Sequence, residues 1–210
     1  MPEKENVGTT TCIVGLVHSS KVYIGGDSAG VNSWLLAIRK RFDPKVFKNG
    51  EMIFGFTTSF RMGQILRYSL TPPKPMEGQD DYEYLCTTFI NEVRKCLGTE
   101  GFKKTKDGVE YGGTFLLGYR GRLYQIESDF QVGRILNNYD ACGCGEEYAL
   151  GALKAMESIV PREPWKIVVK ALQAAEEFSA GVSAPFKVIC SDGEERMYAT
   201  DGEIITEKGG

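Results

Sequence analysis

Two kinds of hydrophobic pattern alternate along the 210-residue chain. In the first kind, short runs of β-branched and aromatic residues flank turn residues, which predicts β-hairpins. The strands are expected within 12–28, on both sides of Asn49-Gly50, at 113–119 and 122–128, and at 186–190 and 195–199. The Asn-Gly pair is the strongest of these turn signals, because both residues tolerate a positive φ.

In the second kind of pattern, apolar residues recur every three or four positions, as on one face of a helix. Helices are expected over 82–97, 146–159 and 164–180. The proline-rich stretch 71–75 excludes a helix locally, so we expect it to join two helical segments.

The order of the predicted elements is paired strands, two helices, paired strands, two helices and paired strands. Strands joined by hairpins form antiparallel sheets rather than βαβ units. Paired helices could then cover the outer face of each sheet. An α+β fold, a four-layer α/β/β/α sandwich of two antiparallel sheets, satisfies this order, although periodicity alone does not single it out. A chain of this length is long enough to bury one sizeable core.

The composition argues against several classes of function. A formal net charge of −3 gives no electrostatic footprint for nucleic acid, and no apolar run approaches the ~20 residues that span a bilayer. The charged first six residues lack the apolar segment of a secretory signal, so we expect a cytoplasmic protein without a membrane partner. Six cysteines without a Cys-x-x-Cys pair and a single histidine argue against a zinc site, and we expect no cofactor.

Two segments could carry unrelated chemistry. His18, the single histidine, lies in a predicted turn, which leaves no Ser-His-Asp arrangement. Residues 143–147 (GCGEE) look like a glycine-rich loop that opens a helix, but the two glutamates disfavour a bound anion. Cys144 could be a thiolate nucleophile at this helix start, although no second histidine is available to pair with it.

The most informative segment is residues 8–16 (GTTTCIVGL), which is followed at 22–28 by VYIGGDS. It resembles the proteasome β-subunit family and its bacterial relative, the HslV peptidase, which are N-terminal-nucleophile hydrolases. Mature chains of this family begin with a threonine, enter a strand, turn, and reach Gly-Asp or a similar pair at the end of the second strand. Counting back from Asp27 without a gap places Thr11 at the nucleophile position of the family.

The resemblance extends over about residues 9–190. Residues 43–47 (DPKVF) are similar to the lysine segment of the family, and residues 55–59 (GFTTS) to its next strand. Residues 141–151 resemble its Gly-Ser-Gly loop with the helix after it, and residues 174–179 resemble the end of its last long helix.

The resemblance also implies catalytic roles. A threonine hydroxyl is a weak nucleophile until a base takes its proton, and a free α-amine with a pKa of about 7.7–8.0 can do so. Lys45 would lie beside the hydroxyl of Thr11 and lower the local proton affinity, and Asp27 would hold that lysine. These three residues would form the catalytic centre.

Three positions depart from the family pattern. Cys144 replaces the serine of the Gly-Ser-Gly loop, although its thiol can donate a weak hydrogen bond. Ser179 stands where proteasome subunits carry a second aspartate, so the protonation of the α-amine would be tuned differently. Ser59 replaces a glycine, and its backbone N–H would stabilise the oxyanion. The resemblance places Phe47 and Thr57 near the substrate pocket.

The exact nucleophile depends on where the chain is cut. Residues 1–10 would be a propeptide-like extension ahead of a proteasome-like domain at 11–210, and their removal would free the α-amine of Thr11. The family usually cleaves after glycine, and the glycine ahead of the threonine run precedes Thr9. Thr9 and Thr10 therefore remain alternatives, although each requires a longer first hairpin.

Two functions follow from these expectations. The first is a threonine endopeptidase, a hydrolase that processes itself and assembles as a homo-oligomeric, self-compartmentalised ring. Its substrates would be peptides or unfolded proteins, and an ATPase unfoldase is a possible partner. The second is an unprocessed, inactive structural or binding subunit, which would keep residues 1–10 and be indifferent to Thr11→Ala.

Overall fold

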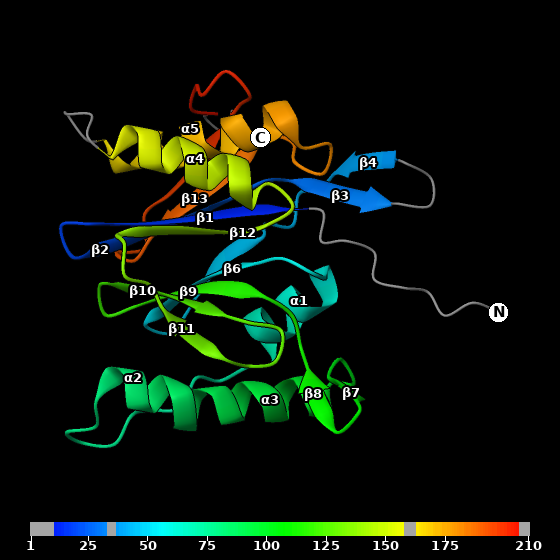
Figure 1. The fold of residues 1–210 in the computed structure, drawn as a ribbon, viewed down its shortest axis with the longest axis vertical. Coiled ribbons are helices and arrows are strands. Elements are labelled where there is room, and N and C mark those ends of the chain that lie inside the picture. The colour runs from blue at the N-terminus through cyan, green and yellow to red at the C-terminus, as the bar shows by residue number, and fades with distance from the viewer. Residues whose placement is uncertain (1–10, 33–36, 158–162, 206–210) are drawn as a thin grey trace, which may run out of the picture.

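The structure, a computed structural model, describes residues 11–32, 37–157 and 163–205, which form four stacked layers (Figure 1). One outer layer holds α4 (Glu146–Met156) and α5 (Pro164–Phe178), at the top of Figure 1. On the opposite side lie α1 (Phe60–Tyr68), α2 (Asp81–Tyr84), the π-helical segment η1 (Leu85–Phe89) and α3 (Ile90–Thr99). Two sheets fill the space between these helices, so the predicted α/β/β/α order is confirmed.

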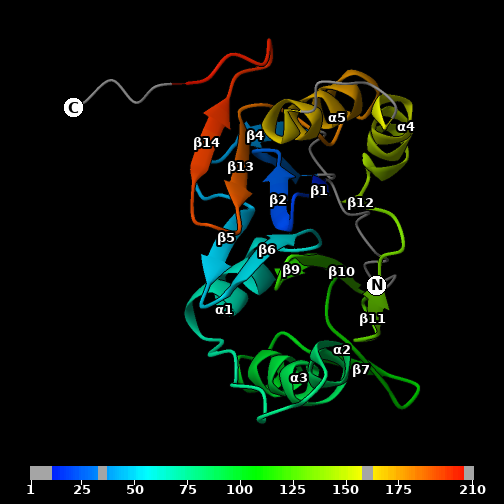
Figure 2. The same cartoon turned by 90° about the vertical axis from the view of Figure 1, so that its left-hand side faces the viewer.

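The sheet beneath α4 and α5 has the strand order β12-β1-β2-β13-β14 (Figure 2). Its strands are β1 (Cys12–His18), β2 (Lys21–Gly26), β12 (Tyr139–Gly143), β13 (Phe186–Cys190) and β14 (Glu195–Tyr198). All its recorded pairings are antiparallel. In the central hairpin Ile13 pairs with Gly26, which brings the start of β1 beside the end of β2.

The second sheet has the order β11-β10-β9-β6-β5 and is also antiparallel. Its strands are β5 (Val46–Asn49), β6 (Met52–Phe56), β9 (Phe115–Tyr119), β10 (Arg122–Ile126) and β11 (Val132–Arg134). Two short hairpins lie outside the sheets: β3 (Ala29–Asn32) with β4 (Ala37–Lys40), and β7 (Lys104–Lys106) with β8 (Val109–Tyr111).

Apolar side chains fill each of the three spaces between the four layers. The space between the two sheets holds Ile13, Val22, Ile24, Val46, Ile53, Leu116, Leu123, Cys142 and Ile189, all buried. Gly55 lets the sheets approach closely, because a Cβ there would lie 2.4 Å from Ile13 Cγ2. Burial of this kind is the main stabilising term of the fold.

The structure refines the predicted elements. The stripe at 82–97 is helical, but a π-helical segment interrupts it. The helix predicted at 164–180 ends at Phe178, because Ser179 has an extended backbone. The hairpins β3–β4 and β7–β8 are additions, since their strands of three or four residues are too short to show a clear hydrophobic pattern.

Some predictions fall on residues outside the described ranges. These are the extension 1–10 with Thr9 and Thr10, and the last two residues of the helix predicted at 146–159. Among the helices that the structure does describe, none combines the length and the apolar character needed to cross a membrane.

Candidate active site

Three buried polar residues meet at one end of the space between the sheets. Thr11 directly precedes β1, Asp27 directly follows β2, and Lys45 directly precedes β5 of the second sheet. The antiparallel register of β1 and β2 sets Thr11 and Asp27 side by side, and the close approach of the sheets brings Lys45 to them. The site is therefore a product of the hairpin and of the sandwich together.

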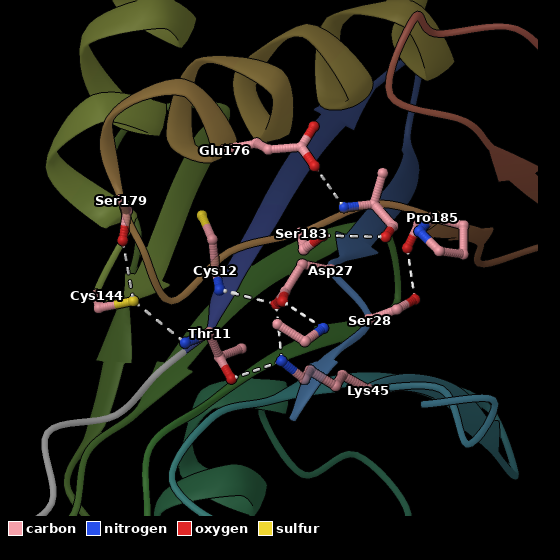
Figure 3. A network of polar contacts seen from close by, with 12 residues as sticks. Thr11, Cys12, Asp27, Ser28, Lys45, Cys144, Glu176, Ser179, Ser183 and Pro185 are labelled. Atoms are coloured by element: carbon pink, nitrogen blue, oxygen red, sulfur yellow. Dashed lines mark hydrogen bonds and ion pairs between the residues drawn. The ribbon is translucent and has the colours of Figure 1, made fainter. Parts of the chain in front are cut away.

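The ammonium of Lys45 bridges the other two side chains (Figure 3). Its Nζ lies 2.8 Å from Thr11 Oγ1 and 2.9 Å from Asp27 Oδ1. The side chains of Lys45 and Asp27 are 1% and 0% exposed. Asp27 is held further by the backbone N–H of Cys12 on Oδ1, at 3.1 Å, and by that of Ala29 on Oδ2, at 2.8 Å. The carboxylate thus accepts hydrogen bonds on both oxygens, which fixes its orientation.

Burial shifts the pKa values of both charged groups. It lowers the pKa of Lys45, although the nearby carboxylate of Asp27 opposes this change. It raises the pKa of Asp27, against the effect of Lys45 and of the two backbone donors. Both shifts have the same main cause, which is the removal of a charged group from water.

These residues stand out from the rest of the interior. Among the residues whose exposure the structure describes, the buried polar or charged ones are Thr11, Asp27, Lys45 and Thr57. Burying a charged pair gives little net stability, because desolvation offsets the Coulomb attraction. A strongly perturbed, buried group of this kind is therefore a candidate for function.

Cys144 and Ser179 lie on the other side of Thr11. The backbone N–H of Thr11 donates to Cys144 Sγ at 3.2 Å, and that sulfur lies 3.2 Å from Ser179 Oγ. Gly143 permits the close approach, since it has a φ of 103° and a Cβ there would lie 2.2 Å from the carbonyl oxygen of Thr11. Cys144 and Ser179, two of the three departures from the family pattern, are therefore in contact, and Cys144 also contacts the backbone nitrogen of Thr11.

The three residues predicted on the substrate side, Phe47, Thr57 and Ser59, have different surroundings in the structure. Phe47 is 2% exposed and stacks on Phe54 in the core, with ring centroids 5.1 Å apart. Thr57 is buried, and both its N–H and its hydroxyl donate to the carbonyl of Thr114. The roles of Phe47 and Thr57 in substrate binding stay predictions.

Ser59 is the N-cap residue that directly precedes helix α1. Its hydroxyl caps the helix by accepting the N–H of Arg61 at 3.1 Å. Its own N–H, the predicted oxyanion donor, is engaged by the carbonyl of Thr57 at 2.7 Å. Thr58 between them has a φ of 63°, the left-handed region that is strained for a β-branched residue. A substrate oxygen would have to replace that carbonyl.

Sequence reasoning missed a pair of residues beside the lysine. The ring of Phe60 lies 5.6 Å from Lys45 Nζ, and the guanidinium of Arg41 lies 3.8 Å above the same ring. Arg41 also forms an ion pair with Asp43. The aromatic residue that opens α1 was not singled out, because only the tertiary fold brings it to Lys45.

The alternative use of Cys144 gains no support from the geometry. The single histidine, His18, is the last residue of the seven-residue strand β1, so it lies about 20 Å along that strand from Thr11, which directly precedes the strand. No group of three or more His, Cys, Asp or Glu side chains that could hold a metal ion is found within the described ranges.

Comparisons with known proteins were made for the sequence and for the structure. No protein-family model and no curated protein matches the sequence. Several solved structures match the fold. BPH from Thiobacillus denitrificans, in complex with epoxomicin, superposes with a TM-score of 0.71 at 16% identity, covering 85% of this chain and 97% of that chain.

Two further structures show the same similarity. Eukaryotic HslV from Trypanosoma brucei has a TM-score of 0.60 at 17% identity and covers 85% of this chain and 98% of that one. Anbu, the ancestral β-subunit from Yersinia bercovieri, has a TM-score of 0.61 at 15% identity and covers 94% and 88%. The chain therefore has the proteasome-like fold of HslV and the ancestral β-subunit, as the sequence resemblance predicts.

Proposed function

We propose that this protein is a threonine-type peptidase whose nucleophile is the hydroxyl of Thr11. The single observation that carries the proposal is the contact of Lys45 Nζ with both Thr11 Oγ1 and Asp27 Oδ1, at 2.8 and 2.9 Å, in a buried site. A hydroxyl next to a buried, carboxylate-held ammonium is poised for loss of its proton. The fold shared with HslV supports the same reading.

The proposed reaction begins once residues 1–10 are removed and Thr11 carries a free α-amine. This amine, with an ordinary pKa near 8, takes the proton of Oγ1 while the charge of Lys45 stabilises the developing alkoxide. Oγ1 attacks the peptide carbonyl carbon, the protonated α-amine gives its proton to the peptide nitrogen, and the C–N bond breaks, so that the new amine leaves and an ester remains on Thr11. Water then hydrolyses the ester on Thr11 by the reverse proton movements.

Cys144 and Ser179 have a supporting part in this proposal. In the present chain the nitrogen of Thr11 donates to Cys144 Sγ. After cleavage the same sulfur would accept a hydrogen bond from the α-amine, and the Ser179 hydroxyl, 3.2 Å away, would fix the position of the sulfur. Binding of the oxyanion at the Ser59 N–H would require the bond to the Thr57 carbonyl to break.

The finer features of the function rest on the resemblance. We propose peptides or unfolded proteins as substrates, a homo-oligomeric ring that encloses the sites, self-processing at Thr11 and a cytoplasmic location. An ATPase unfoldase is the partner that such a ring would need for folded substrates. The domain boundary at residue 11 belongs to the same proposal.

A second candidate function is an inactive structural or binding subunit. The engaged N–H of Ser59 favours it, because the predicted oxyanion donor already has a backbone acceptor. In that case residues 1–10 stay attached and the buried ion pair has only a structural role.

Measurements of intact mass and of peptide cleavage distinguish the peptidase from the inactive subunit. We expect the purified protein to lose its first ten residues and to cleave fluorogenic peptides, and Thr11→Ala to abolish both. Thr9→Ala and Thr10→Ala are the matched controls and should keep turnover. Epoxomicin, which BPH binds, is the first inhibitor to test. A mass that starts at residue 1 or 2, without turnover, would show the second function instead.

A further inference from the structure

The segment that connects α5 to β13, residues 179–185, contacts the candidate site at two separate places (Figure 3). At its first residue, Ser179 Oγ lies 3.2 Å from Cys144 Sγ, the atom that accepts the N–H of Thr11. At its other end, the segment reaches the backbone next to Asp27. One short connection therefore spans both sides of the nucleophile.

The second contact runs through Ser28, the residue after Asp27. The carbonyl of Ser183 accepts the N–H of Ser28 at 2.9 Å, and the carbonyl of Pro185 accepts its hydroxyl. The carbonyl of Ser28 in turn accepts the N–H of Arg41 at 2.9 Å. The N–H, the hydroxyl and the carbonyl of Ser28 thus all form hydrogen bonds. Because Asp27 directly precedes Ser28, the fixed backbone of Ser28 helps to position the carboxylate of Asp27.

Glu176 holds this segment near its C-terminal end. Its Oε1 accepts the backbone N–H of Ala184, which is 2% exposed, at 2.8 Å. Glu176 lies in the last turn of α5, where a negative charge opposes the helix dipole. Its neighbour Glu177 is exposed. The carboxylate of Glu176 therefore contributes through its hydrogen bond to Ala184 and does not stabilise the helix.

We propose that Glu176 is a positioning residue of the peptidase, which acts through residues 179–185 to hold Cys144 and Asp27 in register around Thr11. The inference rests on the proposed function. Catalytic groups must keep their productive geometry to within about 0.5 Å, and misplacement by about 1 Å can lower the rate about 100-fold. Loss of the Ala184 contact releases both contacts of the segment at once, so it lowers kcat rather than substrate affinity.

The test compares Glu176→Ala, Glu176→Gln and the matched control Glu177→Ala in the full-length protein. The number of active sites is counted by titration, and kcat and KM are measured per site with one fluorogenic peptide. We expect Glu176→Ala to lower kcat about tenfold with KM within twofold. Glu176→Gln keeps a carbonyl acceptor for Ala184 and should retain at least half of the activity, as should Glu177→Ala.

A purely structural role gives a different result. In that case Glu176→Ala lowers the melting temperature and the fraction of active sites, but each remaining site turns over at the normal rate, which would overturn the inference. Ser28→Ala supplies a second variant if Glu176→Ala does not fold. We expect Ser28→Ala to lower kcat by itself. We expect the double variant Ser28→Ala/Glu176→Gln to have a kcat no lower than that of Ser28→Ala.

Failure of the proposed function can be told apart from failure of this inference. If the wild-type protein shows no turnover, amide hydrogen exchange of Ser28 becomes the readout. We expect Glu176→Ala to accelerate that exchange at least tenfold and Glu177→Ala to leave it unchanged. Equal exchange in both variants would remove the link between Glu176 and the site, whatever the activity.

Discussion

The space between the two sheets is apolar at its centre and charged at one end. At the centre Ile13, Ile24 and Ile53 are fully buried among other aliphatic side chains. At the end where β1 begins, Lys45 and Asp27 are buried to the same degree but form an ion pair. Burial of apolar surface stabilises the fold at about 25 cal/mol per Å², whereas a buried ion pair contributes little net stability. Substitutions at the charged end should therefore abolish activity, and removal of both charges should restore stability, whereas substitutions at the apolar centre should lower stability alone.

Removal of one charge from the polar end should have the largest effect. Lys45→Met leaves the carboxylate of Asp27 buried without its counter-ion, so we expect a loss of about 3–5 kcal/mol in the free energy of unfolding. Peptide cleavage should also fall at least about 100-fold, because the hydroxyl of Thr11 loses the ammonium that lies 2.8 Å from it. Urea denaturation and a fluorogenic assay measure the two effects.

The double variant Lys45→Met/Asp27→Leu sharpens this comparison. Replacing both charges by apolar groups removes the desolvation penalty, so most of the lost stability should return while activity does not. If the double variant were as unstable as Lys45→Met, the ion pair would be a stabilising element and the contrast with the apolar centre would fail.

Substitution at the apolar centre should lower the stability of the fold without lowering the activity of the folded molecules. Ile53→Ala removes a fully buried side chain, and we expect it to destabilise the protein by ~2–4 kcal/mol. Activity per folded molecule should stay within about twofold, because Ile53 belongs to the apolar cluster between the sheets and carries no polar group. Val109→Ala, at a position that is 46% exposed in β8, is the control and should change stability by less than about 0.5 kcal/mol.

The thiol beside Thr11 should have an intermediate effect on rate. Cys144→Ala removes the acceptor 3.2 Å from the nitrogen of Thr11, so we expect kcat to fall about tenfold, equivalent to ~1.4 kcal/mol. Cys144→Ser keeps a polar atom there and should retain most of the activity. Equal rates for the alanine variant and the wild type would separate Cys144 from the chemistry.

The smallest effect is expected at the rim of the first sheet. Burial, with repulsion from Glu146 and Glu127, raises the pKa of Asp140 to about 6. The folded protein therefore binds a proton that the unfolded chain releases near pH 4, so stability from this group is present at low pH and is lost as the pH rises through 6.

Replacement of Asp140 should remove that dependence. We expect Asp140→Asn to be more stable than the wild type at pH 8 by ~1 kcal/mol, a value reduced for solvent screening of a partly exposed group, and equally stable at pH 4. Thermal unfolding at the two pH values tests this. A constant difference at both would mean that the titration of Asp140 has no part in stability.

The sequence pattern predicted antiparallel sheets with paired helices, and the family resemblance supplied the four-layer sandwich and the candidate residues Thr11, Asp27, Lys45, Cys144 and Ser179. The pattern at 12–28 predicts a hairpin, and its register places Asp27 opposite Cys12, so Thr11 follows directly beyond that pair. The choice of Thr11 as the nucleophile came from the family resemblance. The position of Lys45 came from the resemblance alone, because no local pattern states which strand of the second sheet lies beneath β1. The structure now brings Lys45 to both residues.

Other features could not be read from the chain. The engaged N–H of Ser59 depends on the left-handed backbone of Thr58, which a threonine rarely adopts. The contact of Glu176 with Ala184 joins a helix end to a loop, and helical periodicity predicts only that Glu176 is a polar residue. Such features arise from tertiary packing, which overrides local preference.

The most direct test of the account locates a covalent adduct. The protein is treated with a peptide-based electrophilic inhibitor, digested and sequenced by tandem mass spectrometry. The account predicts a modified N-terminal peptide that begins at Thr11, with the adduct on that residue and none in Lys45→Met. An adduct on Cys144 instead, or peptide cleavage by a chain that still carries residues 1–10, would contradict it.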